Sequence, residues 1–198
     1  MALSKNNSAP PSHVGGGVSV WDNTTILIQE CIARNREAQK ALYDKYAPTA
    51  YSLIKRYTRH DELAAEMLND AFYKVLTKLE QYSHEGSFEG WIRRIVVNTV
   101  TDHLRKHIRK REHEVLTDVP ENVSFDNDIV GGMSYKELLV LVHELPDMQR
   151  AVFNMYVFED YKHKEIAEVL DTTEGNSRWY LNDARKRLKE KIYSVMKR

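Results

Sequence analysis

Apolar residues recur at helical spacing along almost the whole chain after Asp22. The clearest run is a ladder with an apolar residue at every fourth position: Leu63, Met67, Ala71, Val75 and Leu79. This spacing is typical of an amphipathic helix with one buried stripe, whereas a half-buried strand alternates with period two. No segment alternates with period two for long enough to predict a sheet. The sequence therefore predicts an all-α protein.

The predicted helices fall into two groups, and each group can form a helical bundle. The expected helices are 22–58 (with a break or kink before Pro48), 61–82, 87–106, 135–145, 147–159, 162–170 and 174–196. Between the groups, residues 114–134 are acidic and contain Pro120 and the pair Gly131-Gly132, which is typical of a flexible linker. We therefore expect a disordered tail over 1–20, a first domain over 21–110, a linker over 111–134 and a second domain over 135–198.

Charge is distributed unevenly, although the 29 basic and 29 acidic residues of the 198-residue chain cancel. Residues 91–113 have a net charge of +5, residues 114–145 of −6 and residues 178–198 of +6. Two basic segments separated by an acidic one favour two surfaces that face a polyanion. Charge alone is also compatible with ordinary solvated helix faces.

Several classes of protein are excluded by what the sequence lacks. Cys31 is the only cysteine, so there is neither a disulfide framework nor a cysteine-based zinc site. No apolar run approaches the roughly 20 residues that span a bilayer, so we expect a cytoplasmic protein without membrane insertion. His103 and His107 have a zinc-compatible spacing but no evident third ligand. There is no phosphate-binding glycine loop or nucleophile elbow, so we expect no enzymatic activity, metal or cofactor.

The segment "SFEGWIRRIVVNTVTDHLRK", residues 87–106, has two helical stripes with different chemistry. The first is an expected core stripe: Phe88, Ile92, Ile95, Val96 and Thr99. Beside it lies a polar stripe bordered by Trp91: Arg94, Asn98, Thr101 and Arg105. An asparagine can read one base edge, arginines can hold phosphates, and a tryptophan can stack on a base. The preceding polar loop could form the wall of a pocket for an extruded base.

The C-terminal segment "HKEIAEVLDTTEGNSRWYLNDARKRL" predicts a helix-turn-helix, because "DTT" is a short connection between two amphipathic helices. The expected inward residues are Ile166, Ala167, Leu170, Ser177, Leu181, Ala184 and Leu188. Thr172 or Thr173 can cap the second helix. The opposite face would present Gly175, Trp179, Asn182, Asp183 and Lys186, with Arg178 on its flank. Amides, a carboxylate and cations on one face suit base edges and phosphates in a major groove.

Three segments together resemble bacterial RNA polymerase sigma factors of the extracytoplasmic-function class. They are "LAAEMLNDAFYKVL", "GSFEGWIRRIVVNTVTDHLRK" and "ELPDMQRAVFNMYVFEDYKHKEIAEVL", in this order. The resemblance covers about residues 22–107 and 135–193. Its most specific parts are the W-x-x-R-I-x-x-N-x-x-x-D-x-x-R run from Trp91 to Arg105, and L-P-x-x-x-R from Leu145 followed by E-I-A from Glu165.

The resemblance implies a sigma factor that binds core RNA polymerase and promoter DNA and melts the DNA to begin transcription. Its implied minus-ten contacts are Tyr82, Ser83, His84, Glu85, Gly86, Trp91, Arg94, Asn98, Thr101 and Arg105. Its implied minus-thirty-five contacts are Thr173, Gly175, Asn176, Arg178, Trp179, Asn182, Asp183 and Lys186. Its implied polymerase contacts are Glu66, Asn69, Asp70 and Phe72. It also implies that free protein is restrained, by an anti-sigma factor or by packing of its own two domains.

The chain departs from the family pattern at two places. Leu63-Ala64-Ala65-Glu66 and Asn69-Asp70 stand where the family usually has an acidic cluster followed by Gln-Glu, so this face carries fewer charges. The family usually has threonine at the position of Asn176, and small or basic residues at those of Trp179 and Asp183. We therefore expect an unusual promoter preference.

Two other interpretations stay open. A dimeric helix-turn-helix regulator that binds duplex DNA without polymerase would explain residues 135–198 equally well, but it gives the polar stripe no role. A sigma-like interaction protein would keep the polymerase-like or inhibitor-binding surfaces, but it has no need of the basic second helix of the helix-turn-helix.

Overall fold

A computed structural model describes residues 20–108 and 134–196 of the chain, and every regular element in these ranges is helical. The first range contains η1 (Val20–Asp22), α1 (Thr24–Ile32), α2 (Arg36–Ile54), α3 (Asp61–Thr77), η2 (Leu79–Gln81) and α4 (Phe88–Ile108). The second contains α5 (Tyr135–His143), α6 (Asp147–Val157), α7 (His163–Leu170) and α8 (Glu174–Met196). The all-α fold in two helical bundles is confirmed. Residues 1–19 of the tail expected over 1–20 and residues 111–133 of the linker expected over 111–134 lie outside the described residues, whereas Val20 begins η1 and Ser134 caps α5.

Side-chain caps fix where several helices begin. The Asn23 and Asn35 side chains accept from the first free backbone N–H groups of α1 and α2. Ser134 forms a capping box with Glu137 at the start of α5. Each such cap satisfies donors that have no partner within the helix and contributes about 1 kcal/mol to stability.

The single helix expected over 22–58 is wrong, because the chain turns between α1 and α2. Arg34 adopts a left-handed conformation, with φ of 60°, and Asn35 then caps the next helix. In contrast, α2 continues through Pro48, where a break or kink was expected. An asparagine that follows a positive-φ residue is therefore the boundary signal in this segment, and the proline is not.

The first bundle is built around α2, α3 and α4, with α1 packed against α2. The predicted ladder is largely correct, since Met67, Ala71, Val75 and Leu79 are all buried. Removing a large apolar side chain such as Met67 from water stabilises the fold by roughly 1.5–3 kcal/mol. Polar residues on the outer faces remain at the surface.

The second bundle packs α5, α6 and α7 against the long helix α8. All seven inward residues predicted for α7 and α8 are buried. Asp171 ends α7 in a left-handed conformation, and Thr173 accepts from the Asn176 backbone N–H at 3.0 Å, so that only the "DTT" segment separates the two helices. The predicted helix-turn-helix geometry is confirmed.

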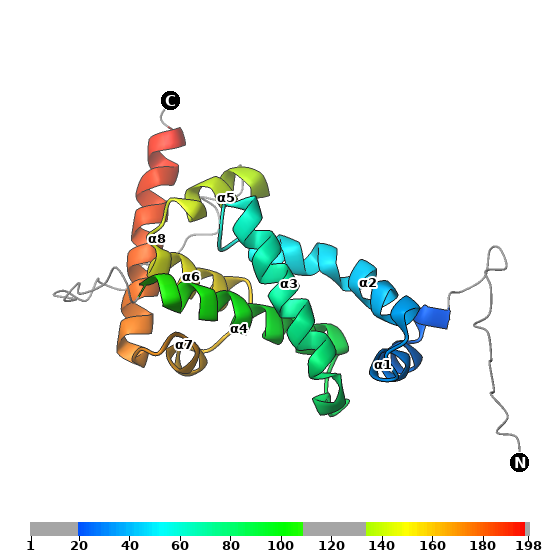
Figure 1. Ribbon diagram of the computed structural model, residues 1–198. Helices are drawn as coiled ribbons and strands as arrows, with labels where there is room; N and C mark the ends of the chain where they lie inside the picture. Colours follow the sequence, from blue (N-terminus) through cyan, green and yellow to red (C-terminus); the bar gives the residue numbers. More distant parts are fainter. Residues whose placement is uncertain (1–19, 109–133, 197–198) are drawn as a thin grey trace, which may run out of the picture.

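The two bundles pack directly against each other through α4, which contacts both α6 and α7. In Figure 1, α4 (green) runs beside α6 and α7 toward α8, while α1 and α2 lie on the far side of α3. As a result, α4 is packed on two sides. Val97, Val100 and Leu104 are buried in addition to most of the predicted core stripe, as expected for a helix with neighbours on more than one side.

Candidate nucleic-acid interface

The loop before α4 is held in a tight turn by its own side chains. The Tyr82 hydroxyl donates to the Gly86 carbonyl at 2.9 Å, and His84 and Gly86 both have positive φ angles. Ser87 then caps α4 by accepting from the Gly90 backbone N–H at 3.0 Å. Tyr82 itself is buried, whereas Ser83, His84, Glu85 and Gly86 are exposed. The loop therefore offers its middle residues to a ligand.

An aromatic cluster of Tyr82, Phe88 and Trp91 joins this loop to the first turns of α4. The Tyr82 ring centroid lies 5.1 Å from that of Phe88 and 5.5 Å from that of Trp91, and Phe88 and Trp91 are stacked at 5.6 Å. Trp91 is half-buried, so the indole is part of this cluster and partly open to solvent. A fixed, partly open aromatic ring beside a structured loop can receive an unstacked base.

The polar stripe of α4 is only partly as expected. Arg94 and Asn98 are exposed, and Arg105 is half-buried. Thr101 was expected to contact DNA, but it is fully buried. Its hydroxyl donates to the Val97 and Asn98 carbonyls of its own helix at 3.0 Å. Its hydroxyl proton is used within α4. Thr101 therefore offers no free donor to DNA.

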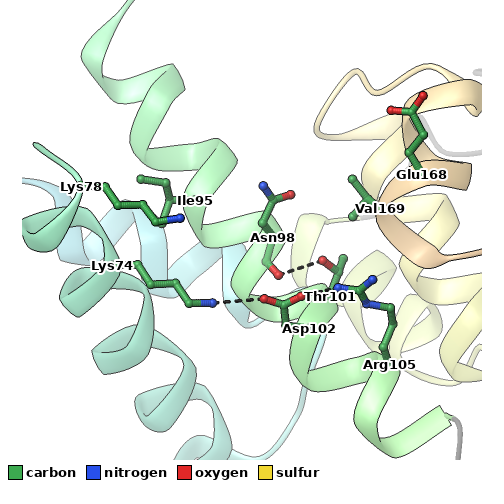
Figure 2. Close-up of a pocket in the computed structure, with 9 residues that line it drawn as sticks. All are labelled: Lys74, Lys78, Ile95, Asn98, Thr101, Asp102, Arg105, Glu168 and Val169. Atoms are coloured by element: carbon green, nitrogen blue, oxygen red, sulfur yellow. Dashed lines mark hydrogen bonds and ion pairs between the residues drawn. The ribbon is translucent and has the colours of Figure 1, made fainter. Parts of the chain in front are cut away.

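Asn98 faces a cavity of about 460 Å³ between the bundles, which is large enough for a small organic group. Figure 2 shows Lys74 of α3 and Lys78, which directly follows α3, on one side of Asn98, and Glu168 and Val169 of α7 on the other. Among the described residues, no hydrogen-bond partner is recorded for the Asn98 side-chain amide. The amide therefore keeps its donor and its acceptor for a ligand.

The charges at the base of this cavity form a linked set. Asp102 contacts Lys74 at 3.2 Å and is also paired with Arg105. Burial raises the pKa of Asp102, but hydrogen bonds from Arg105 and Lys74 outweigh this and lower the pKa below its ordinary value. Asp102 thus stays ionised and positions two cations beside Asn98, which gives the cavity a positive rim suited to phosphate.

On α3, three of the four predicted polymerase contacts form an exposed face. Glu66, Asn69 and Asp70 are exposed, whereas Phe72 is buried and packs against Tyr43 with ring centroids 4.7 Å apart. Phe72 was expected to contact polymerase, but it is buried and supports this face from inside the bundle. Asp70 also lies 2.9 Å from His103 Nε2. The side-chain oxygen or nitrogen atoms with which Glu66, Asp70 and His103 could bind a metal ion lie within 4.8 Å of one another. The His103–Asp70 hydrogen bond accounts for the orientation of the histidine.

On α8, the exposed residues lie at the first turn and along one edge. Thr173, Gly175, Arg178 and Lys186 are exposed, and Arg178 is paired with Glu174 at 2.8 Å. Asn176 is half-buried, and its amide donates to the Thr172 hydroxyl at 3.2 Å. These residues can approach DNA with the helix as it stands.

Three residues expected on the outward face of α8 are more enclosed. Asn182 is buried, and Trp179 is half-buried with its ring edge-on to Tyr180 at 5.3 Å. Asp183 accepts from Gln149 of α6 at 3.0 Å and from Arg187 at 2.7 Å. The helical spacing predicted one buried stripe on this helix, but α8 packs against both α6 and α7, which widens its buried surface. The predicted outward placement of Asn182 is wrong.

The sequence pattern also missed residues that shape the site. Lys74 at the end of α3 and Lys78 just after it line the cavity on one side, and Glu168 and Val169 of α7 line it on the other. Lys74 and Lys78 are four positions apart in the helix predicted over 61–82, so the sequence does indicate that these two cations share one side of it. The participation of α7 depends on how the bundles meet, for which the sequence carries no periodic signal.

Each bundle matches a known protein family, and related proteins match across both bundles. Residues 42–110 match the family described as Sigma-70 region 2, and residues 135–188 match Sigma-70, region 4. The ECF RNA polymerase sigma-E factor of Haemophilus influenzae is 22% identical over 86% of this chain and 95% of its own length. The ECF RNA polymerase sigma factor SigM of Bacillus subtilis is 26% identical over 75% of this chain and 91% of its own.

A solved structure shares the fold at low identity. It is the sigma factor RpoE of Bartonella quintana in complex with the anti-sigma factor NepR, which is 15% identical with a TM-score of 0.50. It covers 79% of this chain and 96% of its own. No helix in the described ranges is long and apolar enough to cross a membrane. With two sigma-70 regions in order on two helical bundles, the chain belongs to the extracytoplasmic-function class of RNA polymerase sigma factors.

Proposed function

We propose that this sigma factor binds core RNA polymerase through the exposed face of α3 and opens the minus-ten element on α4. The observation that supports this most is Asn98, an exposed amide with a free donor and acceptor beside a cationic rim and an aromatic loop. One unpaired base can be read by the amide, while the flanking phosphates meet Arg94 and Arg105. A flipped base would contact Trp91 and the exposed residues 83–86.

The second bundle would read the minus-thirty-five element with the first turns and outer edge of α8. Thr173, Gly175 and Arg178 lie where a recognition helix meets base edges, and Lys186 lies farther along, where a phosphate contact is expected. Asn182, buried, is left out of this surface. Trp179 and Asp183, both half-buried, would contribute through their remaining open edges.

The protein would act by differential binding and would catalyse no reaction. Holding the single-stranded minus-ten element more tightly than duplex offsets the cost of unstacking a base, which is a few kcal/mol. Its partners would be core polymerase, promoter DNA and an anti-sigma factor, and it would work in the cytoplasm, without metal or cofactor. We propose the domain boundaries 21–110 and 135–198 for these two tasks, joined by a linker over 111–134.

The test combines core polymerase and this protein on promoter DNA that is mismatched across the minus-ten region. We expect initiation at one start site that depends on both proteins. A parallel binding measurement uses the same promoter as intact duplex without polymerase. Tight, specific duplex binding together with no polymerase association would contradict the proposal and favour a helix-turn-helix regulator.

A further inference from the structure

Asp183 of α8 is held by two donors that come from different helices. Its Oδ2 atom accepts from the Gln149 side-chain amide of α6 at 3.0 Å and from Arg187 Nε, one turn further along α8, at 2.7 Å. Because both donors bind the same oxygen, they fix the carboxylate in one orientation. The other oxygen, Oδ1, accepts no hydrogen bond from any of the described residues.

The second oxygen of Asp183 reaches the surface of the bundle. The side chain as a whole is only 13% exposed, yet Oδ1 is not among the buried side-chain atoms that lack a partner in the described part of the chain. An oxygen that is neither buried nor bonded is open to solvent, and so to a ligand that approaches α8. The exposed Lys186 lies three positions further along, on the same side of the helix. Asp183 therefore offers one acceptor beside the proposed phosphate contact.

Gln149 is almost fully buried, which is unusual for a glutamine. It is 7% exposed and stands in α6 beside the buried Met148. A buried amide donor without a partner is unfavourable, and here Asp183 supplies the partner. Rotation of the carboxylate away from Gln149 would leave this amide unpaired. The bond between α6 and α8 therefore holds Asp183 more firmly than an exposed contact within one helix would.

Arg187 offsets the charge that would otherwise keep Asp183 away from DNA. An unpaired carboxylate is repelled by phosphates. Arg187 is exposed and forms an ion pair with Asp183, so the two side chains together carry no net charge. Lys186 adds a cation beside them. The carboxylate can therefore enter a groove whose phosphates are held by its neighbours.

A single carboxylate oxygen favours cytosine in the major groove. Cytosine presents an amino donor there, whereas guanine and thymine present acceptors that repel a carboxylate. Adenine also presents an amino group, but the acceptor N7 lies beside it and faces the same carboxylate. One good contact of this kind corresponds to a preference of about tenfold for the correct base.

We propose that Asp183 reads a cytosine of the minus-thirty-five element through Oδ1, and that Gln149, outside the helix-turn-helix, is the positioning residue that sets this preference. The inference rests on the proposed function, because it names the base read by the same surface of α8. Gln149 acts through Asp183: it holds Oδ2 and so keeps Oδ1 available to the base.

The test uses holoenzyme reconstituted from core polymerase and the full-length chain. It is incubated with duplex promoter DNA whose minus-thirty-five element is randomised, and the bound DNA is sequenced to give the base frequencies at each position. Gln149→Met keeps the length of the side chain but removes the donor, and Asp183→Ala removes the reading group. The matched control is Glu144→Met, which breaks a different polar contact with α8, the 2.5 Å ion pair of Glu144 with Lys191.

We expect the wild type to enrich cytosine about tenfold at one position, and Gln149→Met to lose most of this preference at that position alone. Asp183→Ala should lack the preference, and adding Gln149→Met to it should change nothing further, because the two residues act as one unit. Glu144→Met should keep the wild-type frequencies. If Gln149→Met lowers helix content by circular dichroism, Gln149→Asn takes its place, since its amide is one methylene too short to reach Asp183.

Several results would overturn the inference. Gln149→Met could keep the cytosine preference, or weaken binding of all sequences equally, which is the result expected if Gln149 serves packing alone. Asp183→Ala could leave every base frequency unchanged, or alter a position at which the wild type enriches another base. Gln149→Met could also change the frequencies when Asp183 is already alanine. The proposed function survives each of these results as long as the wild type selects a defined minus-thirty-five element. If the wild-type holoenzyme selects none, the proposed function of the second bundle fails instead.

Discussion

Asn98 is the side chain whose removal tests strand reading most directly. It is exposed, and no hydrogen-bond partner is recorded for it within the described residues, so replacing it should leave the fold intact. We expect Asn98→Ala to weaken binding of the single-stranded minus-ten element by roughly 1–3 kcal/mol, which is the value of one good base contact, and to relax selectivity at one position. Anisotropy with a set of strands that differ at single positions measures both effects.

The control for Asn98→Ala is Gln29→Ala, which removes an exposed amide from α1, away from the cavity. It should change neither affinity nor selectivity. If Asn98→Ala binds every minus-ten variant as the wild type does, Asn98 is an ordinary surface residue.

Single residues also show where sequence reasoning was limited. The spacing of Asn98 and Arg94 was sufficient to place them at the surface of α4. Thr101 lies at the same helical spacing but is fully buried and bonded within its own helix. Helical spacing gives the direction in which a side chain leaves its helix, but it does not show which neighbouring element covers that side.

At the scale of elements, amphipathic period and caps were sufficient to predict most helices and the helix-turn-helix. The exceptions are helices packed on more than one side. In α8, Asn182 and Asp183 were expected to face outward, but α6 and α7 both contact this helix. The turn between α1 and α2 was missed because Arg34 needs a positive φ, and arginine gives no sequence signal for it.

Lys186 on α8 separates a phosphate contact from base reading. It is exposed, and no recorded ion pair holds it among the described residues. We expect Lys186→Ala to weaken minus-thirty-five duplex binding about equally for all sequences and to reduce the slope of log K against log salt by about 1. Titrations at several salt concentrations measure this slope.

Lys136→Ala is the control for Lys186→Ala, because Lys136 is an exposed cation of the same bundle at the start of α5. Its salt slope should equal that of the wild type. An unchanged slope in Lys186→Ala would show that Lys186 makes no phosphate contact, and a changed base preference would assign it to base reading instead.

At the scale of the whole molecule, the contact between the bundles could not be predicted in detail from the sequence. Glu159 of the second bundle is fully buried and forms an ion pair with Arg56 of the first, 103 positions away, and neither residue belongs to a periodic pattern. The sequence predicts buried apolar stripes because burial repeats along a helix. A buried charge depends on a partner that only the tertiary structure brings near.

His143 of α5, whose Nε2 lies 2.7 Å from the Lys55 carbonyl of the first bundle, makes the contact between the bundles sensitive to pH. Burial lowers its pKa below the ordinary value of 6.5, and the nearby cations Arg150, Arg59 and Lys55 lower it further, although the bond to the Lys55 carbonyl acts in the opposite direction. The neutral imidazole is therefore favoured while the bundles are packed. This contribution to stability is complete above the ordinary pKa and is lost as the pH falls from 6.5 toward the lowered value.

We therefore expect acidification from about pH 7.5 to about pH 5.5 to lower the efficiency of fluorescence transfer between dyes attached at Thr49→Cys of α2 and Glu190→Cys of α8, which are both exposed positions. His143→Gln should flatten this dependence, because glutamine does not titrate. His60→Gln, which removes an exposed histidine before α3, should keep the wild-type profile. Burial also lowers the pKa of His163. This histidine lies within the second bundle and forms a hydrogen bond with Ser177, so we expect its protonation to change the thermal stability of that bundle more than the distance between the bundles. A pH profile that His143→Gln leaves unchanged would show that the contact between the bundles does not depend on this histidine.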